Sequence, residues 1–158
     1  MLSDTHLSGS SPELPARFIE ELRGAAMVIH AGDIVDPSVL EKIKTFCPKV
    51  LAVYGNMDFQ ETRKLLPERE IIKIGKYKIG LMHGYGAPDS LAEKVADAFK
   101  NDAVDVIIFG HSHTALKEMR KGILLFNPGS LTDRVFTDHN SFGILEINDT
   151  IRARIVRI

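Results

Sequence analysis

Short apolar runs rich in valine and isoleucine recur along the chain, and they constrain the fold more than any other feature. Four of them lie before residue 110, at 26–30, 50–54, 79–83 and 104–109. Runs of this length and composition are typical of buried strands. Segments with helical spacing, at 12–23 and 37–46, accompany the early runs, and each opens with Ser or Asp followed by proline. This alternation predicts βαβ units.

The pattern changes in the second half of the chain. Gly75 and Lys76 stand between two alternating stretches within 70–82, which is typical of a hairpin, and a further helix is expected at 89–100. After Gly110 only strands and turns are predicted, at 116–119, 123–126, 142–147 and 151–158. We therefore expect an α/β fold, in which two mixed β-sheets pack as a sandwich flanked by helices in α/β/β/α layers. The length of 158 residues suits a single domain over residues 1–158.

Charge and cysteine content argue against several classes of protein. The 20 Lys and Arg residues nearly balance the 21 Asp and Glu residues, so no overall field favours nucleic acid or an anionic membrane. Cys47 is the single cysteine, which leaves no internal disulfide and no thiolate set for a zinc finger. The sequence shows neither an apolar run of bilayer length nor a secretory signal. We expect a soluble protein of the reducing cytoplasm with no membrane partner.

Polar residues capable of binding metal gather in five short clusters. The last four clusters each follow one of the apolar runs directly, and the carboxyl edge of an open α/β sheet is where ligands bind. Their carboxylate, amide and imidazole groups suit Mn²⁺, Fe, Zn²⁺ or similar ions. In an extended segment residues i and i+2 point the same way, so paired ligands within a cluster can reach one centre. The clusters are Asp4-Thr5-His6, Gly32-Asp33-Ile34-Val35-Asp36, Gly55-Asn56-Met57-Asp58, His83-Gly84 and Gly110-His111-Ser112-His113.

Each cluster taken alone also has an ordinary structural explanation. Asp4 and His6 could form a surface turn, Asp33 could cap a helix, and Asn56 with Asp58 could form an Asx-type turn. His83 could be a hydrogen-bonded histidine at a strand end. The five clusters in this order after successive strands nevertheless favour a shared metal centre.

The order and residue types of the clusters resemble the signature of the calcineurin-like metallophosphoesterase superfamily, which runs D-x-H, GDxxD, GN-x-[DE], H and GHxH. The resemblance covers nearly the whole chain and is strongest to the small phosphodiesterases of that superfamily. It implies hydrolysis of a small phosphoester, above all a phosphodiester, by a hydroxide that bridges two divalent cations. Mn²⁺ is the expected metal, with Ni²⁺, Fe, Zn²⁺ and Mg²⁺ as alternatives.

The resemblance also implies two sets of metal ligands that share Asp33. One ion would be bound by Asp4, His6, Asp33 and His113, and the other by Asp33, Asn56, His83 and His111. Asp33, Asn56 and His83 are also the residues expected to carry catalysis.

Two positions depart from the superfamily pattern. Many members have a histidine after the motif asparagine that can protonate the leaving oxygen, but this chain has Met57, whose thioether cannot donate a proton. We therefore expect selectivity for leaving groups that are stable as anions, and a role for Asp36 limited to local hydrogen bonding or a helix start. In addition, only three residues precede Asp4, so Asp4 and His6 are expected to be held less firmly than the other ligands.

Five further features lie outside the five clusters. His30 could support Asp33 or be a satisfied core histidine, and His139 is assigned to solvent. The segment 127–130 is read as a Pro-Gly turn beside the centre. Arg134 could pair with a substrate phosphate but fits an ordinary surface arginine better, and Tyr85 could line the pocket.

A noncatalytic interaction module that keeps this fold is the alternative function. The retromer scaffold subunit resembles the same superfamily and works as a binding partner. All seven ligand positions carry competent residue types here, which favours catalysis, whereas Met57 favours the module. A nuclease lacks support because no basic stripe with interleaved aromatics is present. The hairpin at 70–82 would allow a homodimer without requiring one.

Overall fold

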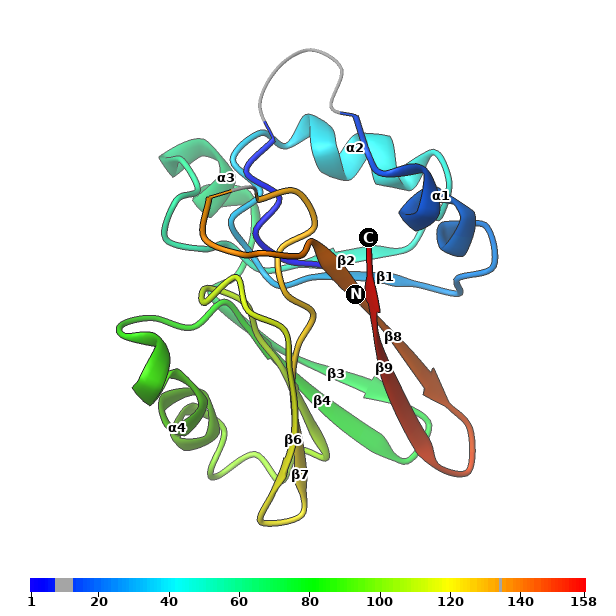
Figure 1. Ribbon diagram of the computed structural model, residues 1–158. Helices are drawn as coiled ribbons and strands as arrows, with labels where there is room; N and C mark the ends of the chain where they lie inside the picture. Colours follow the sequence, from blue (N-terminus) through cyan, green and yellow to red (C-terminus); the bar gives the residue numbers. More distant parts are fainter. Residues whose placement is uncertain (8–12, 134) are drawn as a thin grey trace.

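A five-stranded mixed sheet forms one half of the molecule. The computed structural model describes residues 1–7, 13–133 and 135–158 (Figure 1). The strands follow the order β3-β4-β5-β7-β6, in which β4, β5 and β7 are parallel and the outer strands pair antiparallel. Their carboxyl ends therefore meet at one edge. The bounds are β3 Arg69–Ile74, β4 Tyr77–Met82, β5 Val106–Ile108, β6 Leu116–Arg120 and β7 Ile123–Asn127.

The second sheet is assembled around the first three residues of the chain. Strands β1 (Val28–His30) and β2 (Val50–Ala52) pair in parallel, and β8 (Ser141–Ile147) and β9 (Ile151–Arg157) pair antiparallel. Leu2 joins the first pair, because its N–H donates to Ile29 O at 2.9 Å and its carbonyl accepts from Ala31 N at 2.9 Å. Met1 joins the second pair through Gly143, whose N–H lies 2.9 Å from Met1 O.

Helices and sheets stack in four layers (Figure 1), and an apolar cluster fills each of the three interfaces between them. Helices α1 (Ala16–Leu22) and α2 (Ser38–Lys44) pack on the outer face of the second sheet, and α4 (Pro88–Ala98) packs on the outer face of the five-stranded sheet. The alternation along β5 shows how one strand serves two layers: Ile107 faces α4, whereas Val106 and Ile108 face the other sheet. The predicted sandwich of two mixed sheets flanked by helices is confirmed.

The predicted helices and strands are present, and their bounds differ from the predicted ones by a few residues in either direction. The hairpin turns at Gly75 and Lys76, with Ile74 paired to Tyr77. The first predicted helix starts at Ala16; its predicted start, Pro12, lies outside the described residues. A short helix, α3 (Gln60–Leu65), was not predicted, because its sequence QETRKL has no apolar stripe and only Thr62 is buried. None of the described helices has the length and apolar character to cross a bilayer.

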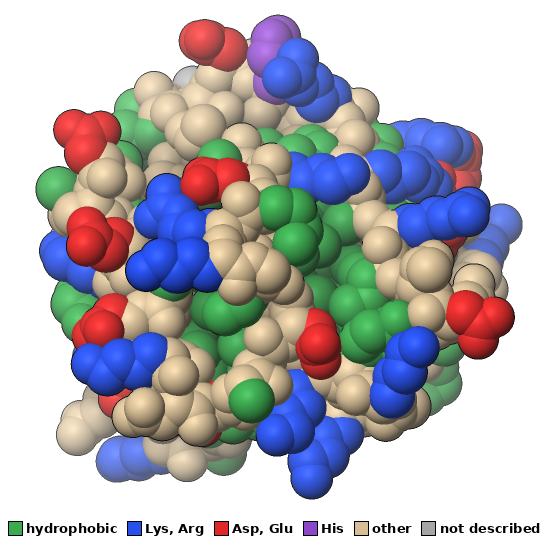
Figure 2. Space-filling model, turned by 90° about the horizontal axis from the view of Figure 1, so that it is seen from below, with side chains coloured by type: hydrophobic (Ala, Val, Ile, Leu, Met, Phe, Trp, Pro, Cys, Tyr) green, Lys and Arg blue, Asp and Glu red, His purple; other side chains and the backbone are tan. Residues whose placement is uncertain are grey.

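A groove separates β1 from β8 beyond the point where residues 1–3 join them. It has a volume of about 470 Å³, and its lining includes Met27, Ile74, Leu145 and Ile147. From below, apolar side chains gather in a hollow of the surface (Figure 2). The metal-ligand candidates lie at the opposite, carboxyl ends of the parallel strands.

Candidate metal centre

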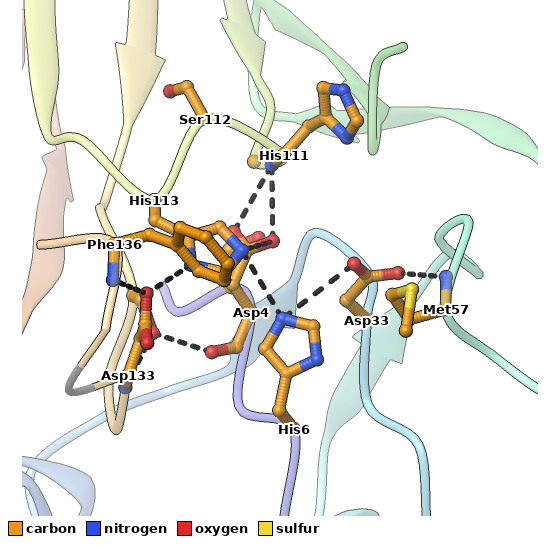
Figure 3. A network of polar contacts seen from close by, with 12 residues as sticks. Asp4, His6, Asp33, Met57, His111, Ser112, His113, Asp133 and Phe136 are labelled. Atoms are coloured by element: carbon orange, nitrogen blue, oxygen red, sulfur yellow. Dashed lines mark hydrogen bonds and ion pairs between the residues drawn. The ribbon is translucent and has the colours of Figure 1, made fainter. Parts of the chain in front are cut away.

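The seven candidate ligands converge between the two sheets although they come from five separate segments. Asp4 and His6 follow the residues that join the second sheet, and Asp33 follows β1. Asn56, His83 and the pair His111 and His113 follow β2, β4 and β5 respectively. The sequence-based placement at strand ends is therefore confirmed, and Figure 3 shows Asp4, His6, Asp33 and His113 around one centre, with the His111 ring set apart from them.

Asp4, His6, Asp33 and His113 form one compact group. Each offers a ligand atom, and these atoms all lie within 4.8 Å of one another. The Nε2 atoms of His6 and His113 are 3.3 Å apart, and His113 Nε2 lies 3.4 Å from Asp4 Oδ1. Two nitrogen ligands of one tetrahedral first-row ion lie about 3.3 Å apart when the metal–nitrogen bonds are about 2.0–2.1 Å. The group therefore fits a divalent cation in both chemistry and spacing.

A second group converges on the other side of Asp33. Asn56 Oδ1 lies 3.1 Å from His83 Nε2 and 2.8 Å from His111 Nδ1. His83 Nε2 is 3.3 Å from Asp33 Oδ2. Asp33 is thus within reach of both groups, as a carboxylate with two oxygens allows. The structure brings together both sets of residues that the sequence predicted.

Burial and hydrogen bonding set the charges of this centre. Burial raises the pKa of Asp4, whose side chain is fully enclosed. Burial alone would also raise the pKa of Asp33, but the His83 hydrogen bond and charge and the Met57 N–H lower it below its usual value. His83 Nδ1 lies 2.7 Å from Ala31 O, which is an acceptor only, so Nδ1 carries a proton, and a cation bound at Nε2 would replace the proton that Nε2 shares with Asp33.

The backbone is left-handed at five of the seven candidate ligands. Positive φ angles occur at Asp4 (50°), His6 (43°), Asp33 (55°), His111 (71°) and His113 (58°). Such conformations are uncommon outside glycine and cluster at functional sites. Asp4 with His6, and His111 with His113, therefore come together through left-handed turns and not through the extended segments that their i, i+2 spacing suggested.

Contacts on both sides hold the segment that carries Asp4 and His6. The N–H groups of Asp4 and His6 donate to Gly32 O at 3.0 Å and Asp33 O at 3.2 Å. Ser130 Oγ donates to Asp4 O at 2.6 Å, and Thr132 Oγ1 donates to Thr5 O. The expectation that these two ligands are held less firmly finds no support in these contacts.

Asp58 organises the loop that carries Asp33, a role that the sequence did not reveal. Its buried carboxylate accepts the N–H groups of Asp33, Ile34 and Val35 at 3.1, 2.8 and 2.6 Å. It also accepts Gly55 N at 2.7 Å. Consecutive N–H groups that converge on one anion form a nest, and this nest stabilises the left-handed Asp33 and Val35. Asp58 therefore ties the loop after β1 to the loop after β2.

Asp133 is a second residue that sequence reasoning missed. Its Oδ2 lies 2.5 Å from His113 Nδ1, so the ring directs Nε2 toward Asp4 and His6 (Figure 3). Its carboxylate also accepts Val135 N at 2.8 Å and Phe136 N at 3.1 Å. The Phe136 ring stands edge-on to His113, with centroids 5.5 Å apart. Only the position of Asp133 shortly after the 127–130 segment could have drawn attention to it.

Met57, which departs from the superfamily pattern, lies beside the centre. The N–H of Met57 donates to Asp33 Oδ1 at 2.7 Å, and its side chain is 55% exposed at the pocket. Asp36 Oδ1 accepts Ser38 N at 2.9 Å, which confirms the predicted helix-start contact.

The remaining predictions have separate outcomes. His30 is fully buried between Thr5 Oγ1 at 3.2 Å and Gly32 N at 3.2 Å, and burial lowers its pKa to about 3, so it is a neutral core histidine. His139 is exposed, as predicted. Asn127 Oδ1 accepts Gly129 N at 2.9 Å, which closes the predicted turn. Tyr85 lines a small side pocket with Asn56 and His83. Arg134 lies outside the described residues.

The main pocket above the centre has a volume of about 920 Å³. Asp33, Asn56 and three histidines contribute to its lining, so candidate ligands of both groups face it. Such a volume is within the range of small-molecule sites.

Comparison with known proteins identifies relatives over nearly the whole chain. The model of the calcineurin-like phosphoesterase superfamily domain matches residues 1–150. Probable metallophosphoesterase MJ0623 of Methanocaldococcus jannaschii is 40% identical over 161 residues, covering 100% of this chain and 80% of that protein. Phosphodiesterase MJ0936 of the same organism is 32% identical over 130 residues, 75% of each chain.

A solved structure with a similar fold belongs to a protein that is not named as a phosphoesterase. Wild-type Vps29 complexed with Zn²⁺, from Entamoeba histolytica, superposes with a TM-score of 0.78 at 28% identity, covering 99% of this chain and 96% of that chain.

Proposed function

Because the chain belongs to the calcineurin-like phosphoesterase superfamily, we propose that it is a metal-dependent phosphodiesterase with a centre of two divalent cations. The observation that carries the proposal is the convergence of two ligand groups on Asp33, which lies 3.7 Å from His6 Nε2 and 3.3 Å from His83 Nε2. One cation would be held by Asp4, His6, Asp33 and His113, and the other by Asp33, Asn56, His83 and His111.

Asp33, Asn56 and His83 would each have a separate role at the centre. Bound cations lower the pKa of a coordinated water and neutralise charge that builds on the phosphoryl oxygens. Asp33 would hold both cations, while Asn56 would contribute a neutral amide oxygen that leaves the centre positively charged and attractive to an anion. His83 presents Nε2 because Ala31 O fixes its tautomer. Ser112 lines the pocket, but its Oγ donates to Thr114 O and accepts from Asn127 Nδ2, and no described hydrogen bond joins it to a base. Direct attack by water therefore fits better than a phosphoenzyme.

Three observations support diesters with good leaving groups. The relative MJ0936 is named a phosphodiesterase. The open pocket leaves room for substituents on either side of a phosphate. Met57 occupies the position from which a proton donor would act, so leaving groups that are stable as anions are favoured.

Mn²⁺ is the proposed metal because the candidate ligands are oxygen and imidazole atoms. A cytoplasmic location is proposed from the free, buried Cys47.

Hydrolysis of bis(p-nitrophenyl) phosphate and p-nitrophenyl phosphate by metal-stripped protein, before and after addition of Mn²⁺, tests this function. Asp33→Asn replaces the carboxylate shared by the two groups with a neutral amide, and Asp138→Asn, at an exposed position, is the matched control. We expect Mn²⁺-dependent hydrolysis, faster for the diester, that survives in Asp138→Asn and is lost in Asp33→Asn. Absence of turnover with every divalent ion tried, in protein whose circular dichroism shows a folded chain, would refute the proposal.

A noncatalytic interaction module is the second candidate. The similarity to Vps29 and the missing proton donor at Met57 favour it. In that case the chain would bind divalent ions without turnover of any phosphoester, and capture of a protein partner would become the informative assay. The intact set of seven ligand types favours the enzyme.

A further inference from the structure

Apolar side chains surround the metal centre at the mouth of the main pocket. Leu7, Met57, Pro88 and Phe136 belong to its lining, and they come from four different segments of the chain. We call these four residues the apolar rim. Met57 and Phe136 are 55% and 74% exposed, and neither belongs to the three apolar interfaces between layers. Folding therefore gives no reason for two large apolar groups at this position.

Both exposed side chains are anchored to the centre through their backbones. The Met57 N–H donates to Asp33 Oδ1 at 2.7 Å. The Phe136 N–H donates to Asp133 Oδ2, which is itself 2.5 Å from His113 Nδ1, and the Phe136 ring stands edge-on to His113. Figure 3 shows Met57 beside Asp33 and Phe136 beside His113. Two apolar groups are thus held at defined positions relative to the candidate ligands.

The size and charge of the pocket narrow what the rim could contact. A volume of about 920 Å³ accommodates a phosphate together with bulky organic substituents. Among the described residues of the lining there is no lysine or arginine, the side chains that usually neutralise additional phosphates. The described surroundings therefore suit a singly charged diester better than a polyphosphate.

We infer that the apolar rim binds an aromatic or similarly apolar ester substituent of the substrate while the metal centre holds the phosphate. The inference rests on the proposed function and adds to it a substrate class: phosphodiesters with at least one apolar substituent. Met57 then contributes to specificity at the position where relatives can have a proton donor. The gain comes from removal of apolar surface from water when the substituent packs against Met57 and Phe136.

Equilibrium binding of two phosphinates to the Mn²⁺-loaded protein tests the rim without any catalytic step. Diphenylphosphinate and dimethylphosphinate carry the same anionic group and no ester bond, so they differ only in their apolar substituents. Calorimetry should show that the diphenyl anion binds at least about tenfold tighter, since burial of one aromatic ring is worth that much. In a variant with both Met57→Ser and Phe136→Ser the preference should fall to about threefold or less.

Matched substitutions outside the pocket serve as controls. Met119→Ser and Phe59→Ser remove side chains that are 64% and 63% exposed and lie outside the described pocket lining, and both should leave the preference unchanged. Equal affinities for the two anions would overturn the inference. A preference for the diphenyl anion that persists in the double variant would also overturn the inference. So would a preference that is equally strong in metal-stripped protein, because it would reflect non-specific binding.

Kinetics separates this inference from the proposed function. Methyl p-nitrophenyl phosphate and phenyl p-nitrophenyl phosphate release the same leaving group, so their ratio of kcat/KM reports only the remaining substituent. A ratio near one with Mn²⁺-dependent turnover of both esters overturns the rim and leaves the phosphodiesterase intact. A phosphinate preference without turnover of either ester supports the rim and refutes hydrolysis.

Discussion

A carboxylate behind a histidine ligand controls both the tautomer of the ring and the donor strength of its free nitrogen. Asp133 does this for His113, because it accepts the proton on Nδ1 and leaves Nε2 to face Asp4. Although burial opposes ionisation, the His113 hydrogen bond and the N–H groups of Val135 and Phe136 lower the pKa of Asp133. Asp133 is therefore ionised at neutral pH and would strengthen His113 as a metal ligand.

Asp133→Asn should weaken metal binding without unfolding the chain. Loss of such a partner typically costs about 10- to 100-fold in metal affinity, because the ligand is less well oriented and less basic. Competition for Mn²⁺ with a chelator of known affinity measures the effect. Asp138→Asn, at an exposed position five residues later, controls for the loss of one negative charge. An unchanged affinity in Asp133→Asn would mean that His113 does not need this partner.

The candidate ligands and their convergence could be predicted from the sequence, whereas the residues that support them could not. Asp33, Asn56 and His83 have the side-chain chemistry of metal ligands and directly follow apolar runs, which is local information. The roles of Asp58 and Asp133 depend on contacts with residues 25 and 20 positions away. Neither the type of these residues nor their spacing reveals which loop will be folded against them.

At the scale of elements, strands such as β1, β5 and β7 were predictable because burial on both faces leaves a continuous apolar run. Each predicted strand is present, but β1, β2 and β5 have only three residues each, since the following positions leave the sheet to form ligand loops. Helix α3 was missed because it is short and polar. The left-handed turns were also unpredictable, because aspartate, valine and histidine have no intrinsic preference strong enough to indicate them.

The packing of α4 on the five-stranded sheet depends on the absence of a side chain at Gly80 in β4. A Cβ at this position would lie 2.8 Å from two carbons of the Phe99 ring at the end of α4. Gly80→Ala should lower the free energy of unfolding by about 1–3 kcal/mol, as overpacking of a core does. Urea denaturation monitored by circular dichroism measures this change.

Gly24→Ala provides the matched control for Gly80→Ala. A Cβ at Gly24 would meet no atom within 4 Å. Its substitution should leave the free energy of unfolding unchanged or raise it slightly, because the unfolded chain loses freedom. Equal midpoints for the two variants would show that Phe99 can move aside and that the helix is not closely packed at this point.

On the scale of the whole molecule, the candidate ligands come from both sheets, and no hydrogen bonds between strands join these two sheets. Asp4, Asp33 and Asn56 belong to the second sheet, whereas His83 and His113 extend from the five-stranded sheet. Cations bound between them would link the two sheets directly. The folded state should therefore gain stability from the metal, because the unfolded chain does not hold these groups together.

Saturation with Mn²⁺ should raise the thermal midpoint of the metal-stripped protein. At a free concentration 100 times the Kd, one site contributes about 2.7 kcal/mol to the free energy of unfolding, provided that the unfolded chain does not bind the ion. Differential scanning calorimetry measures the shift, and Asp33→Asn should abolish most of it. If Mn²⁺ fails to shift the midpoint of the parent, the centre is not a metal site under these conditions.

The hydrogen bonds of Asp58 and of the Met57 N–H affect how proteins with this loop can diverge. The loop after β2 is fixed by Gly55 N and Met57 N, which donate to Asp58 and Asp33, and the Met57 side chain takes no part in these bonds. A proton donor at position 57 could therefore appear or disappear through one substitution without displacement of a single ligand. Substrate range and metal binding are in this way separately mutable, so one scaffold can change the esters it accepts while its centre stays the same.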